Sequence, residues 1–213
     1  MIYIVSGQDA HRYPARMEQV CRLRHKVFVE ELGWSDLARA DGLERDQFDR
    51  ADAIHQICIR DGEVAGYQRM LPTVKPHLLS DVFPELCEGP LPRGLDTFEL
   101  TRYCVAPSYR EGRRGVSSVG SELMAGFVEW GLACRVNKVI IEFETIWVLR
   151  ALQLKFLVRP LGFETKIGNQ RIVATLLQFN RATLQAVREY RKHWAPVISF
   201  LGEHREEGMA MAV

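Results

Sequence analysis

The order of strand-like and helix-like segments is the feature that most limits the folds open to this chain. Residues 53–60 and 63–72 have strand character and are joined by Asp61–Gly62, a dipeptide typical of a tight hairpin turn. The second half instead alternates strand-like and helix-like segments, at residues 138–143, 145–158, 171–179 and 181–192. An antiparallel hairpin followed by strand–helix–strand units predicts an α/β fold, in which a mixed twisted sheet carries helices on both faces as a three-layer sandwich.

A long helical stretch is expected from Pro14 to about Gly33, because proline favours the start of a helix and glycine its end. The apolar residues of this stretch recur at helical spacing, and Arg24 falls inside the apolar stripe. A guanidinium on a buried face requires carboxylate or carbonyl partners, because an unpaired buried charge is very costly. The sequence therefore predicts such partners for Arg24.

The middle of the chain combines an irregular connection with an unusual strand. Residues 72–96 are rich in proline and glycine, so we expect an irregular crossing with one short helical turn. In the strand expected at 97–107, Glu99 and Arg102 have opposite parity, and a bulge between them would turn both side chains toward one site. A glycine-bearing loop at 108–115 then leads into a helix expected at 116–134.

Length and composition favour one domain. The chain has 213 residues, of which 47% are hydrophobic, so we expect a single domain over residues 1–213 with a frayed tail at about 203–213. The net charge of +1 argues against a nucleic-acid partner. No segment approaches the roughly 18 apolar residues of a membrane span, and the first residues lack the basic leader of a signal peptide. We therefore expect a cytoplasmic protein with no membrane partner.

The cysteines and histidines give no sign of a disulfide framework or a metal site. The five cysteines are scattered and show no CxxC pair, a pattern typical of reduced cytosolic thiols. The six histidines have no metal-ligand spacing, so each is expected to be a surface or core residue and no metal is expected.

Charged residues gather in segments that are expected to pack together. They are three arginines and four acids, namely Arg24, Arg69, Arg102, Glu44, Asp46, Asp49 and Glu99. A structural ion network would explain any single pair, since surface pairs contribute only about 0–1 kcal/mol. Several of these residues, however, lie in apolar periodicity, where a charge is expensive to keep. Mutually paired ionisable groups in a cleft are candidates for a functional site.

Five segments carry a family resemblance: RLRHKVFVEELGW, GLERDQFDR, GYQRMLPT, DVFPEL and FELTRY. Together they resemble the acyl-homoserine-lactone synthases, the LuxI-type autoinducer synthase family. The ten signature positions of that family fall, in order, on Arg24, Phe28, Trp34, Glu44, Asp46, Asp49, Arg69, Phe83, Glu99 and Arg102. The stretch from YCVAP to the following helix also resembles the GCN5-related N-acetyltransferase fold, although Gly112 and Gly115 depart from the usual glycine pattern of that fold.

The resemblance implies an enzyme that makes an N-acyl-homoserine lactone from S-adenosylmethionine and an acyl thioester and releases methylthioadenosine. No cofactor is implied besides these substrates. The catalytic residues would be Glu99, Arg102, Tyr103 and Cys104. Glu99 would be the base for the methionyl amine, directly or through a water, and backbone N–H groups near Tyr103 and Cys104 would hold the oxyanion.

The resemblance also implies a binding site for S-adenosylmethionine, formed by Arg24, Phe28, Trp34, Glu44, Asp46, Asp49 and Arg69. The two aspartates would anchor the three arginines, and Glu44 would help to close this lattice. Phe28 and Trp34 would cover the adenine or the methionyl chain, with Phe28 also expected to be half core. Phe83 is expected to pack the irregular crossing.

The acyl chain would enter between the Glu99 strand and the segment KVIIEF, where Phe143, Thr145 and Trp147 are the candidate pocket residues. Thr145 supplies the only local hydroxyl. The two aromatic residues would shorten the pocket and favour a short, branched or aryl acyl group, although core packing explains both residues at least as well.

The acyl donor is expected to be an acyl-CoA or an acyl carrier protein, with a slight preference for acyl-CoA because the acyl-pocket region departs from the family pattern. Either donor would meet the basic residues Arg110, Arg113, Arg114, Lys155 and Arg159. Two alternatives stay open. One is an ordinary N-acyltransferase that acts on another small amine, and the other is a non-enzymatic acyl-ligand sensor with a purely structural lattice.

Overall fold

The computed structural model describes residues 1–110 and 117–202. Within them the chain has the predicted mixed α/β fold, with a nine-stranded sheet in the order β6-β8-β5-β4-β3-β2-β1-β9 and β7 paired to β8. The chain divides into two compact units. Unit 1 comprises Met1–Arg69, Arg102–Phe127 and the segment that begins at Pro196, and unit 2 comprises Met70–Thr101 and Val128–Ala195. A single domain over the whole chain stays a prediction.

Strands β1 (Ile2–Ser6), β2 (Ile54–Arg60) and β9 (Ile198–Phe200) lie side by side in unit 1. Strand β1 runs antiparallel to β2, with Ile4 opposite Gln56, and parallel to β9. The turn between β2 and β3 (Glu63–Pro72) has positive φ at both Asp61 and Gly62, 49° and 81°, so the hairpin predicted from this dipeptide is confirmed.

The helical stretch predicted from Pro14 to Gly33 is present, but its winding changes along the way. Helix α1 (Pro14–Arg24) is followed by a π-helical segment, His25–Glu31, and the stretch ends before Gly33, whose φ is 72°. Phe28, inside the π-helical segment, is buried in the core of unit 1 together with Val20 of α1. π-helical turns are rare and frequently lie at functional sites.

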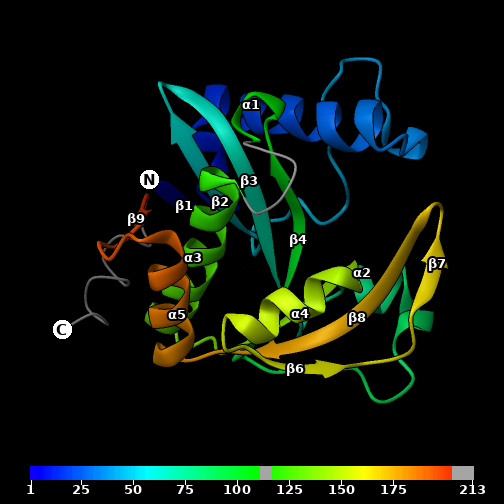
Figure 1. Ribbon diagram of the computed structural model, residues 1–213. Helices are drawn as coiled ribbons and strands as arrows, with labels where there is room; N and C mark the ends of the chain where they lie inside the picture. The colour runs from blue at the N-terminus through cyan, green and yellow to red at the C-terminus, as the bar shows by residue number, and fades with distance from the viewer. Residues whose placement is uncertain (111–116, 203–213) are drawn as a thin grey trace. The chain divides into compact units, whose positions relative to one another are not determined.

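In unit 2, the first residues of β4 (Thr97–Val105) run parallel to β5 (Lys138–Glu144), and Glu99 lies opposite Ile140. On its other side, β5 runs antiparallel to β8 (Gln170–Gln178). Strand β8 also pairs with β6 (Leu157–Pro160) and β7 (Thr165–Ile167), and Figure 1 shows β7 and β8 as a long hairpin.

Four helices of the described chain complete the fold: α2 (Leu78–Asp81), α3 (Ser118–Ala133), α4 (Ile146–Gln153) and α5 (Arg181–Arg191). The predicted irregular crossing contains only α2 and a 3-10 turn at Pro84–Leu86. The side chain of Ser117 caps α3 by accepting the Gly120 N–H at 3.0 Å, and Asn180 caps α5. None of the helices in the described residues is long and apolar enough to cross a membrane.

Three strands differ from the sequence-based prediction. The helix expected at 145–158 ends at Gln153, and Leu157–Pro160 forms β6 instead. Lys155 ends that helix with a positive φ of 61°, a position that glycine usually occupies, so the sequence carried no stop signal there. The three-residue strands β7 and β9 are too short to show an alternating pattern. Part of the glycine-bearing loop, residues 111–116, and the tail expected to fray at 203–213 lie outside the described residues.

Candidate active site

Three arginines and three carboxylates of unit 1 form a closed set of buried ion pairs, which we call the charge lattice. Its members come from α1, from the loop before β2, and from strands β3 and β4: Arg24, Glu44, Asp46, Asp49, Arg69 and Arg102. The three positive and three negative charges cancel. Six of the seven charged residues expected to pack together therefore converge, whereas the seventh, Glu99, is not a member of the lattice.

Arg24 is fully buried and uses both edges of its guanidinium. Its terminal nitrogens donate to the two carboxylate oxygens of Asp49 at 2.7 and 2.9 Å, and its Nε donates to Glu44. Such fork-like pairing fits arginine and no other cation, because only guanidinium presents parallel donors. The partners predicted for Arg24 from its place in the apolar stripe are therefore present.

Arg69 repeats this geometry on β3. It donates to both oxygens of Asp46, at 2.7 and 2.9 Å, and a third hydrogen bond of 2.7 Å reaches Asp49. The loop that carries the aspartates is itself fixed, because Asp46 N–H donates to Asp49 at 3.0 Å and Asp46 accepts from the Phe48 N–H at 2.9 Å. The two aspartates thus join helix α1 to strand β3.

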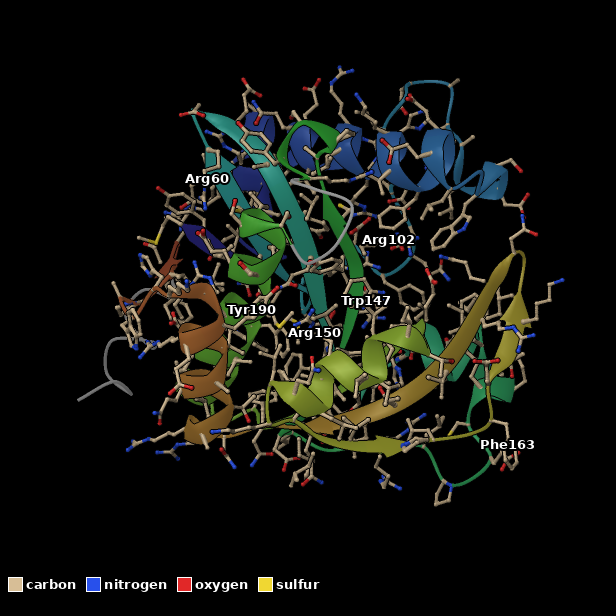
Figure 2. All side chains as sticks on the ribbon, viewed as in Figure 1. Arg60, Arg102, Trp147, Arg150, Phe163 and Tyr190 are labelled. Atoms are coloured by element: carbon tan, nitrogen blue, oxygen red, sulfur yellow. The ribbon has the colours of Figure 1, made fainter. Side chains whose placement is uncertain are left out.

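Arg102 closes the lattice from β4. It donates to Glu44 at 3.1 Å, and its Nη2 lies 2.8 Å from an oxygen of Asp46. Its φ of 53° is left-handed, which departs from strand geometry, whereas the predicted bulge that would turn Glu99 and Arg102 toward one site stays a prediction. The guanidinium carbon of Arg102, which is labelled in Figure 2, also lies over the ring of Phe28, 5.4 Å from the ring centre. A guanidinium over an aromatic face is a cation–π contact.

Phe28 and Trp34 form an aromatic pair beside the lattice. Their rings are stacked, with centres 5.2 Å apart and planes inclined by 22°. Phe28 is buried, whereas Trp34 keeps 40% of its surface exposed. The expectation that Phe28 is partly a core residue is confirmed, and the exposed indole leaves an aromatic face open to a ligand.

The arginines of the lattice lower the pKa of both of its aspartates, against the effect of burial. Burial acts to raise the pKa of Asp49, but the hydrogen bonds and positive charge of Arg24, with the charge of Arg69, outweigh burial and hold that pKa far below its usual range. Nearby, His55 Nδ1 is 2.7 Å from the hydroxyl of Tyr67, and burial lowers the pKa of His55 to about 4. At neutral pH the two aspartates of the lattice are ionised beside a neutral histidine.

Glu99, in unit 2, has a different set of partners. Its Oε1 accepts the Leu79 N–H at 2.7 Å and lies 2.9 Å from His77 Nδ1, and its Oε2 accepts the Leu78 N–H at 2.7 Å. The side chains of Glu99 and His77 are fully buried. The start of α2 therefore fixes Glu99 as an acceptor. Phe83, just beyond α2, packs against the core of unit 2, as predicted.

Comparison with known proteins places these features in a family. The chain matches the family model described as autoinducer synthase over residues 8–187. The chain belongs to the autoinducer synthase family. Its relatives are acyl-homoserine-lactone synthases, so it is an acyltransferase of that class.

One relative of this synthase is the isovaleryl-homoserine lactone synthase of Bradyrhizobium diazoefficiens, 33% identical over 193 residues, which are 89% of this chain and 84% of the relative. Among solved structures, the CoA-dependent acyl-homoserine lactone synthase BjaI, determined with SAM and isopentyl-CoA, matches with a TM-score of 0.88 and 30% identity over 100% of this chain and 98% of that one. The CoA-dependent synthase MesI matches with a TM-score of 0.84 and 28% identity over 93% and 99% of the two chains.

The likeness to N-acetyltransferases is one of fold. A putative N-acetyltransferase from Lactobacillus plantarum matches with a TM-score of 0.53 and 19% identity, covering 84% of this chain and 99% of that one. The expected N-acyltransferase-like fold of the synthase is thereby confirmed, whereas the glycines that depart from the usual loop pattern, Gly112 and Gly115, lie outside the described residues.

The remaining predicted site residues of the synthase are spread over both units. In unit 1, Tyr103 is partly exposed on β4, and burial raises the pKa of the Cys104 thiol to about 12. In unit 2, Trp147 is 43% exposed on α4 (Figure 2), and Thr145 donates its hydroxyl to Glu164 at 2.5 Å. The roles predicted for Tyr103, Cys104, Phe143, Thr145 and Trp147 stay predictions.

Two residues of the Glu99 surroundings were missed from the sequence. His77 was expected only as a surface or core residue, and Glu142 on β5 was not considered. The available signal was weak. Glu142 shares the parity of Ile140 in an otherwise apolar strand centre, and His77 follows a proline directly before a helical turn.

Proposed function

We propose that this synthase joins the methionyl amine of S-adenosylmethionine to the acyl group of a short, branched acyl-CoA and then closes the lactone ring, releasing methylthioadenosine. The observation that carries this proposal is the match over the whole chain to BjaI, a CoA-dependent synthase solved with SAM and isopentyl-CoA. The isovaleryl-homoserine lactone synthase among its relatives supports a branched acyl group.

The first bond to form is the amide. The substrate ammonium gives one proton to Glu99, and the freed nitrogen lone pair attacks the thioester carbonyl. The carbon–sulfur bond then breaks, and the leaving thiolate takes the second proton that the nitrogen loses as the amide forms. Glu99 suits this role because a carboxylate held as an acceptor by fixed donors is oriented before the substrate arrives. N–H groups near Tyr103 and Cys104 would stabilise the oxyanion.

The second bond closes the ring. The methionyl carboxylate attacks its own γ-carbon, and the sulfonium leaves as the neutral thioether of methylthioadenosine. Because a sulfonium is already a good leaving group, the enzyme has chiefly to hold the chain in ring-forming geometry. No further cofactor or metal takes part in either step.

The charge lattice would act as a rigid wall of the S-adenosylmethionine site. Its charges are satisfied internally, so its members need not bind the substrate charge by charge. What the lattice holds in place is the backbone around Phe28 and the loop of the two aspartates. Trp34, stacked on Phe28 with one face exposed, would cover the adenine or the methionyl chain.

The acyl group would lie against the start of α4. The Thr145 hydroxyl is already bound to Glu164, so it is not poised to recognise a 3-oxo group. Phe143 and Trp147 would instead enclose a short apolar chain. Such a pocket favours isovaleryl or similar acyl groups over long ones.

The product test is direct. The purified protein is incubated with S-adenosylmethionine and a panel of acyl-CoA and acyl-carrier-protein thioesters, and the products are identified by mass spectrometry. We expect a branched-chain lactone, with free coenzyme A and methylthioadenosine released in equal amounts. Release of coenzyme A without methylthioadenosine would identify an ordinary N-acyltransferase, and turnover only with the carrier protein would contradict the CoA assignment.

The role of Glu99 is tested by Glu99→Gln, which keeps the shape of the side chain but is a far weaker proton acceptor. We expect kcat to fall by about 10²- to 10⁴-fold, the usual contribution of a positioned base. Glu144→Gln on β5, at an exposed carboxylate, is the matched control and should leave kcat unchanged. A sensor without enzymatic activity would show no turnover in any of the three proteins.

A further inference from the structure

Glu142 lies next to Glu99 in the sheet of unit 2. Glu99 pairs with Ile140 across β4 and β5, and side chains alternate between the faces of a strand, so Glu142 is the next residue of β5 on the face that Glu99 occupies. Glu99 is also an electrostatic neighbour of Glu142, because its negative charge raises the pKa of Glu142, and the two carboxyl groups can share a hydrogen bond when one of them carries a proton. On the other side of β5, Glu142 lies opposite the apolar Ala174 of β8.

The acceptor capacity of Glu99 is filled by this contact. A carboxylate offers about four acceptor positions. Two backbone N–H groups, of Leu78 and Leu79, and the His77 ring nitrogen occupy three of them. A hydrogen bond between two carboxyl groups requires that one of them carry a proton, because two adjacent carboxylates repel each other.

The electrostatics decide which of the two carries it. Burial and then the negative charge of Glu99 raise the pKa of Glu142 well above its usual value. The other charged groups on the same face of β5 are engaged elsewhere, Lys138 with Asp96 at 2.8 Å and Glu144 with Gln170 at 3.0 Å. His77, the other titratable group of this cluster, contacts Glu99. Glu99 is therefore the charged group that acts on Glu142.

Two polar atoms at the ends of this chain are buried without a hydrogen-bond partner in the described structure: Oε1 of Glu142 and Nε2 of His77. Buried polar atoms are nearly always paired, and an exception points to a catalytic role, to stored strain or to a bound water or ion. A purely structural anchor for α2 would need neither a second carboxyl group nor a histidine, since the two backbone N–H groups already hold Glu99.

We propose that Glu142 is a proton-carrying positioning residue for Glu99, so that the two carboxyl groups share one proton and Glu99 is the anion. This proposal rests on the proposed function, in which Glu99 accepts the proton of the substrate ammonium. The backbone donors to Glu99 are fixed, whereas the hydrogen of Glu142 can turn away. When it does, the N–H bond of the ammonium breaks, an O–H bond forms on Glu99, the electron pair stays on nitrogen, and Glu142 keeps its own hydrogen.

Two substitutions separate a proton-carrying role from a space-filling one. Glu142→Gln is a neutral donor and imitates the protonated side chain, whereas Glu142→Leu fills a similar volume without donating. We expect Glu142→Leu to lower kcat at least about tenfold and Glu142→Gln to restore most of that loss, with KM for S-adenosylmethionine little changed in both. Equal kcat values for the two variants would overturn the proposal.

The pH profile gives a second readout. In the wild type, Glu142 loses its proton as the pH rises and its hydrogen bond to Glu99 is lost, whereas the glutamine cannot ionise. The ratio of kcat in Glu142→Gln to kcat in the wild type should therefore rise as the pH increases above the usual pKa of a glutamate. A ratio that stays constant with pH would contradict a protonated Glu142.

A third readout does not depend on catalysis. Because the pKa of Glu142 is raised on folding, the wild type must take up a proton to fold above the usual pKa of a glutamate, so its stability falls with rising pH relative to Glu142→Gln. Urea unfolding at several pH values should show this widening gap, and parallel curves would overturn the proposal. If the gap is present but no lactone is made by the wild type, the proposed function fails and the proton assignment stands.

Discussion

At the scale of single residues, the synthase keeps charges in places where most proteins keep apolar groups. Arg24 and Arg69 have no exposed surface. Each is paired with carboxylates that lie 20 to 25 positions away in the sequence. Replacing such a lattice by apolar residues often leaves stability unchanged, whereas removing one member leaves its partner charged and unpaired. The lattice is therefore brittle toward single substitutions.

Arg24→Ala should destabilise the fold by about 3–5 kcal/mol, because it removes a main partner of the buried Glu44 and of the partly buried Asp49. Urea unfolding measures the loss. Arg22→Ala, two residues earlier on the same helix, is the matched control: Arg22 is exposed and pairs with Glu18, so it should change stability by less than about 1 kcal/mol. Equal effects of the two substitutions would contradict the buried pairing.

His55 should make the fold sensitive to mild acid. Its pKa is about 4 in the folded chain, below the usual 6.5, so between these values the unfolded chain binds a proton that the folded chain does not. Stability contributed by the neutral ring is complete above pH 6.5 and is lost as the pH falls toward 4, by an amount on the order of 3 kcal/mol. In His55→Gln the unfolding free energy should fall less steeply over this range, and parallel curves would show that the ring is charged when folded.

The residues of the charge lattice could be identified from the sequence, whereas His77 and Glu142, the neighbours of Glu99, could not. Arg24 and Arg69 stand in apolar periodicity, which by itself demands acidic partners. His77 and Glu142 reach Glu99 through the pairing of β4 with β5 and through the position of α2. Strand pairing and the path of an irregular connection leave no periodic trace in a sequence, so this cluster could be found only in three dimensions.

At the scale of elements, the change from α to π winding after Arg24 positions the aromatic pair. The wider turn begins at His25 and contains Phe28, and Trp34 donates its N–H to the Phe28 carbonyl at 2.9 Å just after the stretch ends. The segment HKVFVEE gives no sign of this winding, because its apolar spacing fits an α-helix equally well. The π-helical segment places the ring of Phe28 in the core, and the ring of Trp34 stacks on it.

Trp34→Ala should weaken substrate binding more than it weakens the fold. The indole stacks on Phe28 and keeps part of its surface exposed. If that exposed surface stacks on the adenine as proposed, the contact should contribute about 0.5–1.5 kcal/mol, as aromatic pairs do, so its loss should raise KM for S-adenosylmethionine between about 2-fold and about 10-fold. Steady-state kinetics measure the change, with Trp194→Ala as control because Trp194 is 61% exposed outside the site. An unchanged KM in Trp34→Ala would remove Trp34 from the binding site.

At the scale of the whole molecule, the order of elements was enough to predict the mixed sheet, because hairpin turns and helix starts carry local chemical signals. Asp61–Gly62, Pro14 and Asn180 each mark a boundary by their backbone preferences or capping side chains. The short strands β6, β7 and β9 exist only because longer neighbours offer them hydrogen bonds. Tertiary context, which no single segment contains, decides their conformation.

The separation of lattice partners along the chain also governs how the native state is lost. Arg102 and Glu44 are 58 positions apart, so we expect their charges to stay hydrated until helix, loop and strands have been brought together late in folding. Interactions that are absent from the folding transition state slow unfolding but do not speed folding. We therefore expect substitutions in the charge lattice to speed unfolding, which shortens the lifetime of the folded chain, and to leave the folding rate almost unchanged.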